Sequence, residues 1–249
     1  MGAEITERTM NMPVYALLTG RGNNTLKDKN ILDVLGHPVL YYPANATCHS
    51  KWVTNKYCSS DDEKILGEAE KLDHVRIKRP LEYAQPNSQH VDCILHALKV
   101  IGETAEMPDI LVVTLANNVS IRSEWIDACV QKMADDPTLT AVVPVYIDND
   151  HHPLRAKTVG EDGLLHMYEK DVDPNISTNR QDLPPCYFLA HNFWVLNVQA
   201  LLTSGGCGQP PWKFMGDRIA YYPVEDSVDL HHEIDLYLAK EWIKANYTD

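Results

Sequence analysis

The sequence predicts an α/β protein built on one mostly parallel sheet that helices cover on both sides. Short apolar runs alternate along the chain with segments of helical periodicity, which is typical of repeated strand–helix units. The run at 109–115 is apolar at nearly every position, as expected for a central parallel strand that is buried on both faces. Ligands of such sheets bind beyond the carboxyl ends of the strands, so function is expected in the segments that follow strands.

The elements follow one another in a regular order along the chain. Strands are predicted at 14–19, 51–58, 74–78, 109–115, 140–147, 193–198 and 219–224. Helices are predicted to begin near Pro38 and after Ser59, and to cover 88–103, 123–133 with Ser123 as N-cap, and 233–246. Residues 148–192 are rich in Asp, Asn, His and Pro, and we expect them to form an insertion with short strands.

We expect a single domain over 13–249, with the insertion inside it and with 1–12 as a disordered leader. The first twelve residues are polar and unlike a signal peptide, and no apolar run approaches the roughly 18 residues that span a bilayer. A cytoplasmic location without membrane attachment is therefore predicted. The six cysteines are dispersed and form no CxxC pair, so reduced thiols are expected.

The net charge of the chain limits the kinds of ligand that it is expected to bind. The formal net charge is −13, which argues against a nucleic-acid surface because that requires clustered Lys and Arg. An anionic small substrate remains compatible with this charge, since a few local cations override the global field.

Those cations follow the first predicted strand. The segment from Gly20 to Asn30 carries Arg21, Lys27 and Lys29 beside glycines and small polar residues, a composition suited to a triphosphate. The spacing is neither that of a Walker A loop nor that of a dinucleotide fingerprint, which argues against a Rossmann oxidoreductase. A solvated basic turn is the alternative, and composition alone does not decide between the two.

The same segment carries a family resemblance. Residues 14–40 resemble the opening of the CMP-sialic acid synthetase and CMP-Kdo synthetase family, with matches at Arg21, Gly22, Lys29, Asn30, Gly36 and Pro38. Further similar stretches follow in the family's order and together cover residues 14 to 242, namely 60–65, 79–84, 94–98, 152–157, 162–165 and 180–184.

The resemblance implies a three-layer, Rossmann-like nucleotidyltransferase fold and a CTP-dependent cytidylyltransferase that forms a CMP-activated acidic sugar and releases pyrophosphate. Arg21 and Lys29 would hold the CTP phosphates, and Lys27 would substitute for the family's first lysine in a loop that is one residue shorter. The remaining residues expected at the CTP site are Gly20, Gly22, Asn23, Asn30, Arg79 and His90.

A divalent cation is implied as well, because Mg²⁺ offsets the negative charge of CTP. Asp229 matches the first metal-binding Asp of the family, and His231 stands where the second belongs, so Mg²⁺ or a softer divalent ion is expected at these two residues. Asp229 could instead serve the start of the last helix. At most one of His231 and His232 is expected to face the site.

The acceptor side departs from the family. Ala116 replaces the Gln that reads the sugar, Asn118 stands at the metal-binding Asp of the Kdo branch, and His191 lies in Ala-His-Asn in place of Asn-Gly-x. Acceptor binding is predicted at Asn118, Arg155, Lys157, Arg180, Gln181 and His191, although surface or dimer contacts are an equal explanation for the four residues of the insertion.

We therefore expect an acidic acceptor that is neither ordinary sialic acid nor Kdo, and a homodimer formed through residues 148–192. Two other functions remain open. One is a cytidylyltransferase for a phosphonate or other non-sugar acid, and the other is a non-catalytic relative that binds nucleotide or sugar.

Overall fold

The computed structural model describes residues 12–22, 24, 26–203, 207–225 and 227–247. Within these the chain forms two compact units, one comprising the residues up to Pro144 with those from Ala190 onward, the other Val145–Leu189. The predicted leader lies outside the described residues except for Met12.

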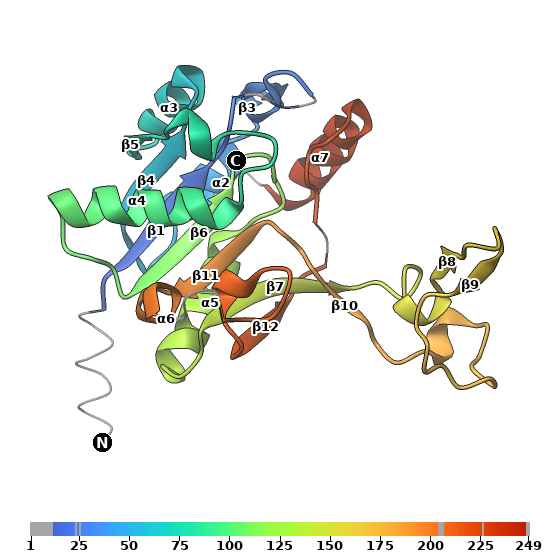
Figure 1. Ribbon diagram of the computed structural model, residues 1–249. Helices are drawn as coiled ribbons and strands as arrows, with labels where there is room; N and C mark the ends of the chain where they lie inside the picture. The colour runs from blue at the N-terminus through green and yellow to red at the C-terminus, as the bar shows by residue number, and fades with distance from the viewer. Residues whose placement is uncertain (1–11, 23, 25, 204–206, 226, 248–249) are drawn as a thin grey trace. The chain divides into compact units, whose positions relative to one another are not determined.

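The larger unit is built on a mixed sheet (Figure 1). Its strands are, in spatial order, β5 (Val75–Lys78), β4 (Val53–Ser60), β1 (Val14–Thr19), β6 (Ile110–Leu115), β11 (Phe193–Asn197) and β7 (Ala141–Ile147), and β12 (Ile219–Pro223) also pairs with β7. β1 pairs in parallel with β4 and β6, whereas β11 runs antiparallel to β6 and β7. The mostly parallel sheet is thus confirmed, and each predicted strand ends within two residues of its observed bounds.

The described residues contain six α-helices, namely α2 (Tyr41–Cys48), α3 (Glu63–Glu70), α4 (His90–Thr104), α5 (Ser123–Asp135), α6 (Val198–Thr203) and α7 (Glu233–Asn246). One predicted helix cap and one predicted helix start were wrong. The N-cap of α5 is Arg122, and Ser123 is already helical. The helix expected near Pro38 begins at Tyr41, because Leu35 and Gly36 adopt positive φ and fold 33–38 into the short β2–β3 hairpin (Asp33–Val34, His37–Pro38) first.

Alternate residues of β1 place the helices on the two faces of the sheet. Val14 belongs to a buried cluster with Ala46 of α2 and Ile126 of α5, while Leu18 packs in a cluster with α3 residues. On the opposite face the Thr19 hydroxyl contacts His90 of α4. Figure 1 shows α4 in front of β1 and α2 behind it. These three layers confirm the predicted Rossmann-like α/β fold.

The smaller unit contains short strands and turns. The last residues of β7 pair with β10 (Tyr187–Leu189), and β8 (Lys157–Val159) forms a hairpin with β9 (Leu165–Met167). Six large apolar side chains of this unit are exposed: Ile147, Val159, Leu164, Leu165, Tyr168 and Tyr187. Two points stay predictions: that this unit is an insertion within a single domain, and that it forms a homodimer.

Over the described part of the chain, no helix has the length and apolar character needed to cross a membrane.

Candidate functional site

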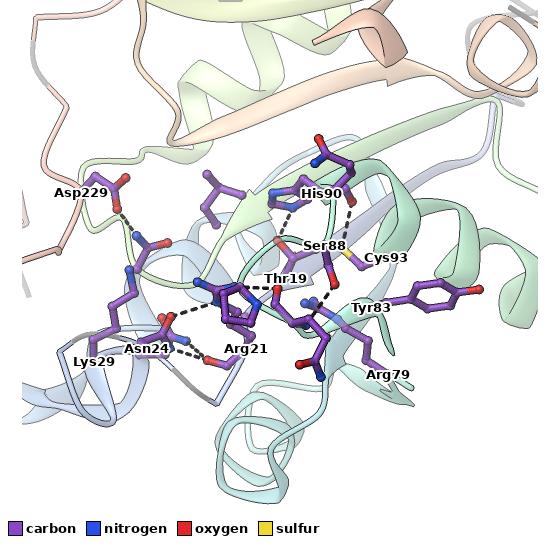
Figure 2. Close-up of a pocket in the computed structure, with 17 residues that line it drawn as sticks. Thr19, Arg21, Asn24, Lys29, Arg79, Tyr83, Ser88, His90, Cys93 and Asp229 are labelled. Carbon is purple, nitrogen blue, oxygen red and sulfur yellow. Dashed lines mark hydrogen bonds between the residues drawn. The ribbon is translucent and has the colours of Figure 1, made fainter. Parts of the chain in front are cut away.

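A cavity of about 360 Å³ lies where β1 and β6 end (Figure 2). It collects residues that are far apart in the sequence, from the loop after β1, the turn before α4 and the segment before α7. Seven predicted site residues line it: Gly20, Arg21, Lys29, Asn30, Arg79, His90 and Asp229. In Figure 2, Lys29 and Asp229 lie toward the left of the cavity, and His90 and Arg79 toward the right.

Gly20 explains how the two strand ends come together. Ala116 N donates to Thr19 O at 2.9 Å, so the loop after β6 runs directly beside the end of β1. A Cβ on Gly20 would stand 2.9 Å from the Cβ of Ala116 and 3.2 Å from Asn30 Nδ2. Only glycine fits this approach without displacing its neighbours.

The Arg21 loop is held by two amide side chains. Asn24 Nδ2 and Asn30 Nδ2 both donate to the carbonyl oxygen of Arg21, at 2.6 and 3.0 Å. The Arg21 guanidinium donates to Gln85 O at 3.0 Å, which links this loop to the turn before α4. The cation is therefore fixed at the wall of the cavity.

Arg79 is a buried cation whose position is set by β4. Its Nε donates to Ser59 Oγ at 3.2 Å and one terminal nitrogen donates to Ser59 O at 2.7 Å. The side chain also lines the cavity, and a guanidinium of this kind can donate to a carbonyl or phosphate oxygen of a ligand.

His90 begins α4 and is a neutral group. Its Nε2 lies 3.0 Å from Thr19 Oγ1. Burial, with a further contribution from the nearby Arg79, lowers the pKa of His90 to about 3. The ring therefore presents an uncharged hydrogen-bonding group to the cavity at neutral pH.

At the other end of the cavity Lys29 and Asp229 influence one another. Lys29 Nζ donates to Leu230 O at 3.0 Å, and burial lowers the pKa of Lys29 while Asp229 opposes this shift. Burial raises the pKa of the Asp229 carboxyl, and His231 and Lys29 oppose that shift. Asn117 donates to Asp229 Oδ1, and His231 Nε2 lies 2.9 Å from Oδ2.

The carboxylate of Asp229 meets the minimal requirement for a magnesium ligand. Mg²⁺ is usually bound through one or two carboxylates together with substrate phosphates and waters, and Asp229 supplies one carboxylate at the cavity wall. Among the residues that the structure describes, no group of three or more His, Cys, Asp or Glu could hold a metal ion. Asp229 thus fits a cation that arrives with nucleotide phosphates, whereas a cage made by the protein alone is not formed there.

Several predicted residues do not line the cavity. Lys27 is exposed, and Gly22 donates its N–H to Asp61 at 3.0 Å beside the cavity. Asn118 is fully buried. Its side-chain amide donates a hydrogen bond to Ser227 and accepts two from Ser120. Asn23 lies outside the described residues.

His191 has an unusual backbone conformation. Its φ of +51° lies in the left-handed region, where non-glycine residues are uncommon. The ring centroid lies 4.7 Å from that of Trp212. Burial lowers the pKa of His191, and the nearby Asp229 opposes this shift. His191 does not line the cavity.

The four predicted acceptor residues of the insertion belong to the smaller unit. Arg155 and Arg180 both contact the carboxylate of Asp150 there, and Lys157 contacts Met167. Gln181 is exposed. Their role in acceptor binding remains a prediction.

Sequence reasoning missed part of the lining, including Thr19, Asn24, Tyr83, Gln85, Ser88 and Asn117. Asn117 could have been found, because it lies two residues after the end of β6, at the ligand-binding edge of the sheet. The turn at 85–89 has no such signal, since its place at the site depends on how α4 packs.

The fold is shared with solved structures at low sequence identity. A structure of CMP:2-keto-3-deoxy-manno-octonic acid synthetase complexed with CTP has a TM-score of 0.69 and 13% identity, covering 94% of this chain and 100% of that chain. A crystal structure of 4-diphosphocytidyl-2C-methyl-D-erythritol synthase from Anaerococcus prevotii has a TM-score of 0.63 and 12% identity, covering 96% of this chain and 99% of that chain. No family model and no curated protein matches the chain. The resemblance to CMP-Kdo synthetases is therefore confirmed as a likeness of fold.

Proposed function

We propose that this protein is a CTP-dependent cytidylyltransferase that joins CMP to an acidic sugar of the ulosonic or nonulosonic type and releases pyrophosphate. One observation carries the proposal: three cations, Arg21, Lys29 and Arg79, converge with the carboxylate of Asp229 in one cavity at the carboxyl ends of parallel strands. The shared fold with a synthetase in complex with CTP supports the same nucleotide.

The chemistry follows from this charge distribution. Arg21 and Lys29 would bind the phosphates of CTP, while Arg79, Asn30 and the neutral His90 would contact the cytidine. Mg²⁺, held by Asp229, would offset phosphate charge. An acceptor oxygen attacks the α-phosphorus in line, the bond to the pyrophosphate oxygen breaks, and the hydroxyl proton passes to solvent. The protein residues contribute by positioning and charge neutralisation.

The acceptor would lie beyond the phosphates, toward His191 and His231. Asn118 links the two segments, because it forms a β-bridge with Asp229 and donates to His191 O at 3.5 Å, and this supports the direction. Asn118 would support this region indirectly, because it bonds the loop at Ser227. We keep Arg155, Lys157, Arg180 and Gln181 as proposed acceptor contacts, contributed by the smaller unit.

A second candidate is a non-catalytic relative that binds nucleotide. Its support is that Asp229 alone among the described lining residues carries a carboxylate, together with His231 in place of a second acid. A phosphonate or other non-sugar acid as acceptor is a third candidate, since Ala116 and His191 change the positions that would read a sugar.

Pyrophosphate release tests these candidates. We would assay each of the four ribonucleoside triphosphates with Mg²⁺ against a panel of sugar acids and phosphonates. The proposal expects release with CTP and a sugar acid, and a fall of roughly 100-fold in Lys29→Met. Lys99→Met, an exposed cation on α4, is the matched control. CTP binding by calorimetry without release from any acceptor would favour the non-catalytic candidate.

We also propose a homodimer formed by the smaller unit. Val159 and Leu165, which are 69% and 71% exposed and pair across the β8–β9 hairpin, support an interface, because adjacent exposed apolar side chains are typical of association sites. Light scattering should give twice the chain mass, and Leu165→Glu should give a monomer. A cytoplasmic location stays a prediction from the sequence.

A further inference from the structure

A second cavity, of about 510 Å³, lies beside the nucleotide cavity within the larger unit. Its walls come from the first turns of α4, from α6 and from residues 211–214. Gln89 and His90 line both cavities, so the two are neighbours with a shared wall. We call this second space the aromatic-walled cavity.

The walls of the aromatic-walled cavity are mainly apolar. They include Leu95, Leu201, Trp212 and Phe214, and Lys213 is the one charged side chain among the described residues that line it. Leu201 is 7% exposed, whereas Leu95 and Leu202 are 39% and 50% exposed, so the wall is buried on one side and reaches the surface on the other. A volume of this size is far larger than a packing defect and is within the range of ligand pockets.

Aromatic contacts fix the shape of this wall. The ring of Trp194 lies 5.4 Å from that of Phe214 and 4.9 Å from that of His90, in edge-to-face arrangements. Trp212 contacts His191 in turn. Aromatic pairs in such arrangements stabilise one another beyond simple burial, so these contacts support the shape of the wall.

His90 separates the two cavities. Its Nε2 is directed to Thr19 beside the nucleotide cavity, while its ring packs on Trp194 toward the second cavity. Trp212, which lines the apolar space, contacts His191, so an acceptor that lies beside His191 can place a side group in that space. Lys213 at the wall is suited to an acid carried by the same molecule.

We propose that the aromatic-walled cavity binds an aryl or branched alkyl substituent of the acceptor. This inference rests on the proposed function and narrows its substrate class to acids that carry such a group. Burial of the group against Leu201 and Phe214 would supply binding energy that a bare sugar acid lacks.

Leu95 offers a variant that fills the cavity with little risk to folding, because its side chain is 39% exposed on α4. Leu95→Trp narrows the space, and Leu95→Met is the matched control that keeps its volume. The first probe is anilinonaphthalene sulfonate, an aryl compound with one acid group. It should bind the folded wild-type chain and Leu95→Met, and bind Leu95→Trp about tenfold more weakly.

The second arm compares acceptors in pairs, each sugar acid and phosphonate with and without an aryl amide substituent, by pyrophosphate release from CTP. The substituted member should have a KM about tenfold lower in wild type and Leu95→Met, and this advantage should vanish in Leu95→Trp. CTP affinity, measured by calorimetry, should be equal in all three proteins.

The outcomes separate the two claims. Pyrophosphate release without preference for the substituted acids, or a preference that survives Leu95→Trp, overturns this inference and leaves the proposed function intact. Unchanged binding of the fluorescent probe to Leu95→Trp also overturns it. Absence of release from every acceptor overturns the proposed function, and the acceptor role of the cavity with it.

Discussion

Gly20 and Ala116 lie against one another where β1 and β6 end, and a Cβ on Gly20 would stand 2.9 Å from the Cβ of Ala116. This contact sets the floor of the nucleotide cavity, because Gly20 leads directly into the Arg21 loop. Ala116 is fully buried, so it has no room to yield.

Gly20→Ala should therefore lower the free energy of unfolding by about 1–3 kcal/mol through overpacking, and weaken CTP binding. Gly67→Ala is the matched control, because nothing lies within 4 Å of a Cβ there and the residue is inside α3. Gly67→Ala should raise stability by about 0.5–1 kcal/mol and leave CTP binding unchanged. Urea unfolding and calorimetry measure both quantities. Equal effects of the two substitutions would contradict the close approach at Gly20.

Removing the charge of Asp229 should stabilise the fold, whereas removing the charge of Asp235 should destabilise it. Burial raises the pKa of Asp229, so its carboxylate is destabilising at neutral pH. Asp229→Asn should therefore raise the melting temperature. The rate of pyrophosphate release should fall on the order of 100-fold. Asp235 Oδ2 accepts the N–H groups of His231 and His232 at 2.7 Å each, at the start of α7.

Asp235→Asn should therefore cost about 1 kcal/mol of stability and preserve most of the rate. Thermal unfolding and turnover of the two variants would be compared at one pH. A melting temperature of Asp229→Asn below that of wild type would show that the contacts of the carboxylate with Asn117, His231 and Lys29 outweigh the cost of its burial.

Acid should destabilise the fold through His74. This residue is 2% exposed, and its Nε2 lies 3.2 Å from Thr47 Oγ1. Burial lowers the pKa of His74 from 6.5 to about 4. As the pH falls below 6.5 the unfolded chain binds a proton that the folded chain refuses, so about 1.4 kcal/mol is lost per pH unit and about 3 kcal/mol by pH 4.

His74→Gln removes this titration, so its unfolding free energy should depend less steeply on pH than that of wild type between pH 6.5 and pH 4. Urea unfolding at intervals of pH measures the two slopes. Identical slopes would mean that His74 is protonated as readily in the folded chain as in the unfolded one.

The sequence predicts the strands well because each apolar run carries its own signal. β1 and β6 are buried at every position, and no polar residue interrupts either run apart from a terminal or penultimate Thr. The start of α2 was misjudged because positive φ at Leu35 and Gly36 creates a hairpin that periodicity does not reveal.

Of the three cations predicted after the first strand, Arg21 and Lys29 line the cavity and Lys27 does not, and the hydrogen bonds within the lining were not predicted. Arg21 and Lys29 follow a strand and are visible in the sequence, but Asn117 and Asp229 are 112 positions apart, and their hydrogen bond depends on the path of the chain before α7. No local pattern encodes that path. The second cavity has the same origin, since α4, α6 and residues 211–214 form it together.

At position 191, glycine should give a more stable protein than alanine, which is the reverse of the usual order. Its φ of +51° costs an L-residue with a Cβ roughly 1–2 kcal/mol, a cost that glycine does not have. His191→Gly and His191→Ala both remove the ring that contacts Trp212, so they differ chiefly in this backbone term. The Gly variant should therefore be about 1 kcal/mol more stable than the Ala variant by urea unfolding.

The KM for the acceptor tests the role of the His191 ring in the same variants. If the His191 ring contacts the acceptor, both variants should raise the acceptor KM by a similar factor, about tenfold, and neither should change CTP affinity. His191→Asn, which tolerates the left-handed conformation and keeps a polar side chain, should recover stability without recovering KM. An Ala variant as stable as the Gly variant would argue that residue 191 is not held at positive φ. Unchanged KM in all three would instead remove His191 from the acceptor site, because the ring would then serve only the packing of Trp212.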